Sequence, residues 1–201
     1  MSEPVQAIDP GERSKARYSY ADYLTWNDEQ RWEIIHGEAW VMSPGPTSRH
    51  QTVTMNLAGM FWQYGKPRNI NVFPAPFDVR LVRDLGKQTQ ADQDIFVIVQ
   101  PDILVICDSA KLDQRGCLGA PDIVVEVLSP TTAMKDESQK LLLYEEYGVR
   151  EYWIVNPDAN YLMIYFHNGS GYEKPGYYRH DEIVESQVLP GLRVSMDEVF
   201  A

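Results

Sequence analysis

The stretch Pro121-Asp-Ile-Val-Val-Glu-Val-Leu-Ser-Pro130 decides how the rest of the chain is interpreted. Residues 123–128 are apolar on both faces of an extended strand, with Glu126 as the exception, which predicts a central strand covered on both sides. A lone carboxylate in such a strand is costly to bury, so we expect it to be paired, hydrogen-bonded or bound to a metal. Glu126 is therefore the first candidate for a functional residue.

A helix and a second strand are predicted immediately downstream. Asp136 followed by Gln139 is typical of a capping box at a helix start, and Gly148 is a natural residue just after a helix end. The run Glu151-Tyr-Trp-Ile-Val155 then predicts the next strand. This order of elements indicates a mixed α/β protein with helices packed against a sheet.

A second acid and a lysine complete the candidate site. Asp102 stands directly before the apolar run 103–106. If the two acid-bearing strands are neighbours, Asp102 and Glu126 can share one Mg²⁺, which prefers oxygen ligands and usually takes one or two carboxylates. Lys140 lies one helical turn before Tyr144, where its ammonium could orient a water or stabilise charge on phosphorus. Two acids and a lysine outline a metal-dependent phosphodiesterase site.

The remaining sequence predicts further strands and helices around this centre. Residues 1–17 are polar and predict a flexible N-terminal arm, followed by a single domain over 18–201. The other predicted elements are a short helix within 18–26, a hairpin over 31–42 with His36-Gly37 at its turn, a helix over 47–64, strands at 71–82, 95–99 and 161–167, and two strands in the tail at 183–188 and 192–196.

Composition narrows the classes of function. No apolar stretch of the 201 residues approaches the roughly 20 needed to span a bilayer, and we see no secretory signal. Cys107 and Cys117 lack a metal-binding spacing, so free thiols and a cytoplasmic location are the simpler interpretation. A net charge of −11 argues against a general nucleic-acid coat protein. That objection is weaker for an enzyme whose acids gather divalent cations.

Taken in order, these motifs resemble the PD-(D/E)XK nuclease superfamily and, more closely, the Uma-two family of putative restriction endonucleases. The resemblance spans roughly residues 18–200, and the order and spacing of the pieces carry it. The pieces are Trp32-Glu-Ile-Ile-His-Gly-Glu38, Met42-Ser-Pro-Gly-Pro46 with His50-Gln51, Gln100-Pro-Asp-Ile103, the stretch 120–130, Asp136 with Lys140 and Tyr144, the stretch 148–157, and Leu189-Pro-Gly-Leu192 with Glu198-Val-Phe200.

The resemblance implies a restriction-endonuclease-like αβββαβ core, with a mixed sheet flanked by helices and an N-terminal β-hairpin. It also implies a divalent-metal site and hydrolysis of DNA phosphodiester bonds. One departure stands out: the superfamily places a lysine two residues after the acid, and here that position is Leu128. The resemblance suggests that Lys140, on the following helix, takes the role of that lysine.

Each candidate residue also has a structural interpretation. A Pro-Asp pair before a strand, as at Asp102, is ordinary turn chemistry. Glu126 could pair with an arginine such as Arg150, and Lys140 could be a solvated helix charge. Glu33, in the hairpin, is either a third acid of the site or a cross-strand partner.

Two further residues stay open at this point. Asp122 shares a strand face with Glu126 and is as well explained by capping as by a role in the site. His50, near a predicted helix start, could assist at the edge of the site, although a structural histidine is the more ordinary interpretation.

The sequence therefore predicts an endonuclease that depends on Mg²⁺ or Mn²⁺. Asp102 and Glu126 are the expected metal ligands, Lys140 the group that acts on water or phosphate, and Glu33 an accessory ligand among the catalytic residues. DNA is the expected substrate and a C₂ homodimer the expected assembly, since cutting both strands is easier with two sites. The alternatives are a non-catalytic binding or assembly protein that retains the fold, or a different metal-dependent phosphoesterase.

Overall fold

The computed structural model describes residues 17–27, 30–42, 45–83, 91–129 and 135–201. The predicted flexible arm at 1–17 lies outside the described residues, apart from Arg17 at its end. None of the described helices is both long enough and apolar enough to cross a membrane.

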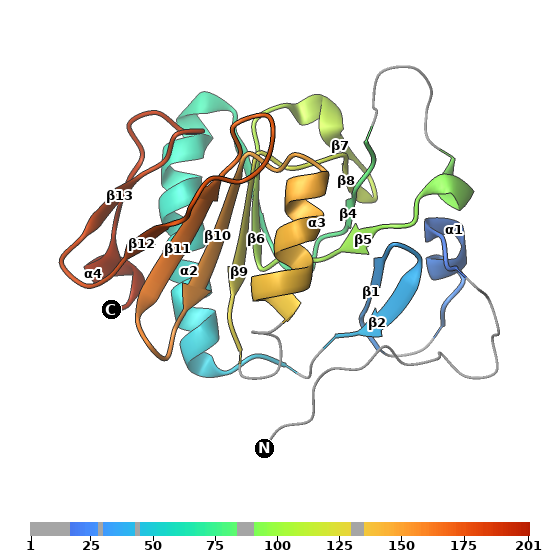
Figure 1. The fold of residues 1–201 in the computed structure, drawn as a ribbon, viewed down its shortest axis with the longest axis horizontal. Helices are drawn as coiled ribbons and strands as arrows, with labels where there is room; N and C mark the ends of the chain where they lie inside the picture. Colours follow the sequence, from blue (N-terminus) through green and yellow to red (C-terminus); the bar gives the residue numbers. More distant parts are fainter. Residues whose placement is uncertain (1–16, 28–29, 43–44, 84–90, 130–134) are drawn as a thin grey trace.

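A six-stranded sheet forms the larger half of the fold, with strand order β12-β11-β10-β9-β6-β3 (Figure 1). Strands β9 and β10 are parallel, and every other neighbouring pair is antiparallel. All five residues of β9 are buried, which confirms the predicted central strand. The strands are β3 (Asn71–Pro74), β6 (Ile103–Ile106), β9 (Ile123–Val127), β10 (Glu151–Asn156), β11 (Tyr161–Phe166) and β12 (Gly176–Tyr178).

Two helices cover the opposite faces of this sheet, as Figure 1 shows. The helix α2 (Ser48–Gly65) buries Leu57 and Phe61 in one apolar core with Val125. The helix α3 (Leu141–Glu146) buries Leu143 in the other core, with Val124 of the same strand. Alternation along β9 thus sends successive side chains to the two helices. The chain order α2–β3–β6–β9–α3–β10 is the expected αβββαβ core.

Local signals fix the start of α2 and the end of α3. Thr47 caps α2 by accepting a hydrogen bond from the His50 amide, one residue before the helix begins. The second helix begins earlier than its predicted cap, because a π-helical segment, η4 (Lys135–Lys140), precedes α3. Gly148 follows its end with a φ of +75°, a backbone conformation that favours glycine.

A second six-stranded sheet, in the order β2-β1-β5-β4-β8-β7, lies beside the first (Figure 1). Its N-terminal hairpin confirms the prediction, with left-handed backbone at His36 and Gly37 in the turn. The strands are β1 (Trp32–Ile35), β2 (Glu38–Val41), β4 (Val79–Arg80), β5 (Ile98–Val99), β7 (Leu112–Asp113) and β8 (Gly116–Leu118).

The predicted strand at 71–82 is not one strand. It divides into β3 of the first sheet and β4 of the second, separated by residues 75–78, which include Pro76. Proline has no backbone N–H for a sheet ladder, so Pro76 is not suited to continue the pairing. The predicted strand at 95–99 likewise shortens to β5.

The remaining elements are short. The predicted first helix is a single turn, in which Ser19 and Asp22 form a capping box. These elements are α1 (Tyr20–Tyr23), η1 (Lys66–Arg68), η2 (Asp92–Asp94), η3 (Ser109–Lys111), the paired strands β13 (Ile183–Glu185) and β14 (Arg193–Ser195), and α4 (Met196–Val199).

Candidate active site

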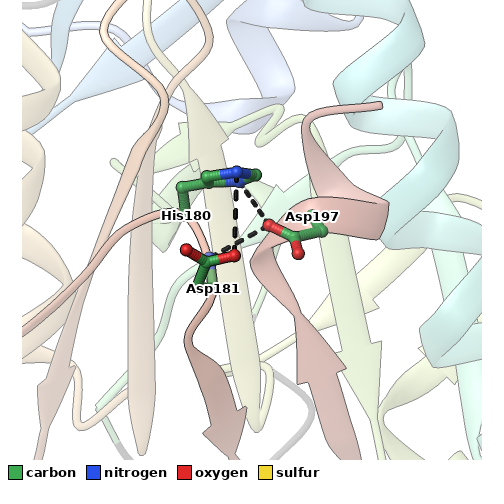
Figure 2. A group of neighbouring side chains, drawn as sticks. All are labelled: His180, Asp181 and Asp197. Atoms are coloured by element: carbon green, nitrogen blue, oxygen red, sulfur yellow. Dashed lines mark hydrogen bonds and ion pairs between the residues drawn. The ribbon is translucent and has the colours of Figure 1, made fainter.

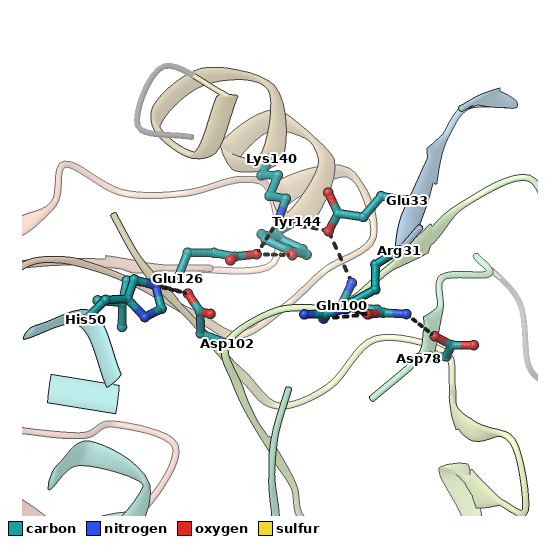
Figure 3. Close-up of polar contacts among 10 residues, drawn as sticks. Arg31, Glu33, His50, Asp78, Gln100, Asp102, Glu126, Lys140 and Tyr144 are labelled. Atoms are coloured by element: carbon teal, nitrogen blue, oxygen red, sulfur yellow. Dashed lines mark hydrogen bonds and ion pairs between the residues drawn. The ribbon is translucent and has the colours of Figure 1, made fainter. Parts of the chain in front are cut away.

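Glu126 and Lys140 meet where β9 passes under the start of α3 (Figure 3). The Lys140 Nζ atom lies 2.8 Å from Glu126 Oε1, and both side chains are about 5% exposed. The Tyr144 hydroxyl, one helical turn further on, donates to the same oxygen at 2.8 Å. Lys140 is therefore a buried partner of the central acid, and the interpretation of Lys140 as a solvated helix charge is wrong.

Glu33 joins this pair from the second sheet. Its Oε1 atom lies 3.0 Å from Lys140 Nζ and accepts the backbone N–H of Gln100 at 3.1 Å. The side chain is only 3% exposed. One ammonium thus connects an acid on β1 with an acid on β9, and the two sheets meet at Lys140.

Asp102 lies at the start of β6, beside β9. The pairing of Ile103 with Val125, continued by one residue, sets Asp102 opposite Glu126. Asp102 Oδ2 accepts the backbone N–H of Val127 at 2.8 Å. The two acid-bearing strands are therefore neighbours, as the sequence predicts. With 22% of its side chain exposed, Asp102 is the most accessible acid of this group.

His50 also reaches Asp102, from the first turn of α2. Its Nε2 atom lies 3.3 Å from Asp102 Oδ2, and its side chain is 9% exposed. On the other side of the ring, Thr54 Oγ1 lies 3.4 Å from Nδ1 and donates to the His50 carbonyl at 2.8 Å. His50 is thus held at the edge of the site and contacts one of its acids.

Asp122 is not brought to this site. Its Oδ2 atom accepts the backbone N–H of Cys107 at 2.8 Å, and its Oδ1 atom lies 3.3 Å from Arg150 Nη1. The structure therefore favours the capping interpretation of Asp122. The arginine considered as a partner for Glu126 faces Asp122 instead.

A polar network behind Glu33 was missed by the sequence interpretation. The Gln100 side chain accepts from Arg31 and donates to Asp78 Oδ1 at 2.7 Å and to the Tyr23 hydroxyl at 3.2 Å (Figure 3). Burial raises the pKa of the Asp78 carboxyl above its ordinary value, and burial followed by Asp78 raises the pKa of Tyr23 to about 12. The available signal was the position of Gln100, two residues before Asp102.

The chemistry of this group suits a hard divalent cation. Glu33, Asp102 and Glu126 offer only oxygen donors, which Mg²⁺ and Mn²⁺ prefer. In their ionised forms the three acids outweigh the single ammonium of Lys140 by two charges, and a divalent cation would balance that excess. Asp102, the most accessible of the three acids, is partly exposed, with 22% of its side chain accessible.

A different group of possible ligands lies in the C-terminal part of the fold. Among the described residues, His180, Asp181 and Asp197 bring three ligand atoms within 4.8 Å of one another (Figure 2). The predicted acids do not form such a trio within the described part of the chain. All three residues of the C-terminal group are exposed, and His180 contacts both aspartates. This group shares no residue with the acid–lysine site and has to be controlled for in any metal titration.

The chain is similar to a protein-family model, to a curated protein and to a solved structure. A family model, Uma2, described as "Putative restriction endonuclease", matches residues 20–197. An uncharacterized protein of Synechocystis sp., slr1290, is 22% identical over 187 residues, which is 92% of each chain. A crystal structure from Anabaena variabilis, described as a putative nuclease belonging to DUF820, superposes with a TM-score of 0.72 at 18% identity. That match covers 91% of this chain and 97% of the other.

Proposed function

Because the chain belongs to the Uma2 family of putative restriction endonucleases, a nuclease-like function is supported, and we propose that the protein is a metal-dependent endonuclease that hydrolyses DNA phosphodiester bonds. The observation that carries the proposal is the buried Lys140 ammonium, held between Glu126 and Glu33 beside the more exposed Asp102. A lysine that only supported the fold would not need two acids next to a third that is partly exposed.

Asp102 and Glu126 are the residues that would hold Mg²⁺ or Mn²⁺. A bound ion of this kind polarises a phosphoryl oxygen and lowers the pKa of a bound water. Each carboxylate is oriented by a hydrogen bond: the Val127 N–H donates to Asp102, and the Tyr144 hydroxyl donates to Glu126.

Lys140 is the proposed catalytic cation. Its ammonium would hold the attacking water or stabilise the charge that develops on the phosphoryl oxygens. Glu33 shares that ammonium with Glu126 and so fixes where it stands. In this scheme Glu33 acts on Lys140 as an accessory acid of the site.

A plasmid-nicking assay tests the proposal. The wild-type protein should nick DNA with Mg²⁺ or Mn²⁺ and stop with EDTA, at low ionic strength because the chain carries a net charge of −11. Lys140→Ala should lose about 10²–10³-fold in rate while calorimetry with Mn²⁺ gives an almost unchanged affinity. Nicking by this variant at the wild-type rate would contradict the assigned role of Lys140.

The exposed C-terminal group supplies the control for metal binding. Asp197→Asn removes one of its ligands without touching the acid–lysine site. Mn²⁺ binding that survives Asp197→Asn and disappears in Glu126→Gln supports the proposed site. A wild-type protein that binds no divalent ion and cuts neither DNA nor RNA is a non-catalytic binding protein with the nuclease fold.

We also propose that two copies form a C₂ dimer, because cleavage of both strands is easier with two sites. Light scattering across micromolar concentrations should give twice the chain mass. A monomer mass throughout that range contradicts the dimer and leaves the proposed site untouched.

A further inference from the structure

Arg31 stands at the entrance to β1, two residues before Glu33. It is exposed, and its backbone is fixed because its carbonyl accepts the Met42 N–H at 2.8 Å. Its guanidinium donates from Nε at 3.0 Å and from Nη2 at 2.6 Å, both to Gln100 Oε1. Arg31 is therefore held in one orientation beside the candidate site.

The acceptor that holds Arg31 is neutral. Within the part of the chain that the structure describes, no carboxylate lies within ion-pair distance of Arg31. Arg80, Arg83, Arg115, Arg150 and Arg193 each face a carboxylate. Arg68 and Arg179, like Arg31, donate to neutral acceptors, but Arg31 is the one whose acceptor also contacts an acid of the candidate site. An amide oxygen orients a guanidinium without cancelling its charge, and it uses only two of the five N–H donors.

Gln100 is well suited to this task because its own amide is fixed. It is buried, and its Nε2 group donates to Asp78 and Tyr23, so its Oε1 atom must face Arg31. Its backbone N–H donates to Glu33. A single residue therefore contacts both an acid of the candidate site and the Arg31 guanidinium next to it, as Figure 3 shows.

We propose that Arg31 binds a backbone phosphate of the nucleic-acid strand that enters the site, an inference that rests on the proposed function. The three acids of the site repel a polyanion, so a strand that approaches them needs a cation on its path. A planar guanidinium matches phosphate oxygens in a bidentate manner, and phosphate contacts fix the position of a strand without reading its sequence. Arg31 positions the substrate and has no part in bond breaking.

Binding measured without cleavage separates this role from a structural one. We would titrate a fluorescent DNA duplex with wild-type protein, Arg31→Gln and Arg31→Lys in EDTA, from about 20 to 150 mM KCl. Losing one phosphate contact should lower the slope of log K against log salt by about 0.9 and weaken binding about 5–10-fold at low salt. Arg31→Lys keeps the charge and should keep the slope, with a smaller loss of affinity.

The matched control is Arg193→Gln, on β14, which removes an exposed arginine paired with Glu185. It should leave slope and affinity unchanged. Wild-type slope and affinity in Arg31→Gln, with an unchanged melting temperature, overturn the role of Arg31 and leave the proposed function standing. A wild-type protein that binds no DNA in EDTA at the lowest salt also overturns the Arg31 role, whereas the nicking assay with Mg²⁺ or Mn²⁺ tests the proposed function separately.

Discussion

Two glutamates are buried on neighbouring strands of the same sheet, and their surroundings differ in kind. Glu126 on β9 faces the ammonium of Lys140 and the hydroxyl of Tyr144. Glu151 on β10 is fully buried and accepts from neutral groups only among the contacts described: the Trp153 indole at 2.9 Å, the Ser186 hydroxyl at 3.0 Å, and the backbone N–H groups of Gln187 at 2.6 Å and Val188 at 2.7 Å.

The contrast shows that burial of a carboxylate does not identify a functional residue. Neutral donors satisfy Glu151, and they tie β10 to the segment that precedes β14, which is a structural task. What distinguishes Glu126 is that it shares its cation with Glu33 and lies opposite the more exposed Asp102. The arrangement of charges around the acid therefore carries the functional argument.

The largest expected difference between substitutions of the two glutamates is in the nicking rate. Glu126→Gln removes a proposed metal ligand and should lower the nicking rate by at least about 10²-fold. Glu151→Gln should nick at close to the wild-type rate per folded molecule, measured at a temperature where circular dichroism confirms folding. Equal losses in both variants would erase the functional distinction between the two sites.

Substitution of Glu151 should lower the stability of the fold more than substitution of Glu126. Glu151→Gln turns an amide NH₂ toward donors that need an acceptor, and it should cost about 2–4 kcal/mol. For a chain of this size that lowers Tm by about 4–16 °C. Glu126→Gln keeps Oε1 as an acceptor, and Lys140 keeps Glu33, so unfolding in urea should change by less than about 1 kcal/mol. A larger loss for Glu126→Gln would make Glu126 as structural as Glu151.

Asp78 offers an intermediate case, held by Gln100 and Tyr23 with no cation in direct contact among the described residues. Burial raises its pKa in the folded protein, so the ionised carboxylate lowers stability at neutral pH, and protonation relieves that penalty as pH falls through the raised pKa. Asp78→Asn keeps the Oδ1 acceptor and should be at least as stable as wild type at pH 7. The difference in Tm should close toward pH 4, and a gap that widens on acidification would contradict this assignment.

The smallest expected effect concerns Asp122, whose carboxylate accepts the Cys107 N–H and faces Arg150. Burial first, and then Asp122, raise the pKa of the exposed Cys107 thiol to about 11. At pH 8 the thiolate is therefore about one part in 10³, and labelling by a disulfide reagent should be slow. Asp122→Asn should accelerate labelling several-fold, with buried Cys117 as the internal control that reacts only after unfolding. An unchanged rate would remove Asp122 from the causes.

The sequence predicted those parts of the fold whose signals are local. Apolar spacing located α2, and His36-Gly37 located the turn of the hairpin. The strand at 71–82 was wrong: Pro76 was a local signal for the break, whereas the placement of the two halves in different sheets depends on tertiary pairing. The contacts of the Gln100 side chain were missed because they are tertiary, since its partner Arg31 is 69 positions away in the chain. The four-residue spacing of Lys140 and Tyr144 predicted that their side chains lie on one side of the helix, and both contact Glu126. The catalytic and metal-binding roles stay predictions.

The contact between Glu33 and Lys140 has a consequence for biosynthesis. Glu33 precedes Lys140 by about 100 residues, and a ribosome adds about 5–20 residues per second, so the acid is synthesised about 5–20 seconds before its cation. Under the proposed function, a nascent chain would carry the hairpin acid without the group that acts on phosphate. The enzyme would therefore be inert toward nucleic acid near the ribosome until most of its length had been translated.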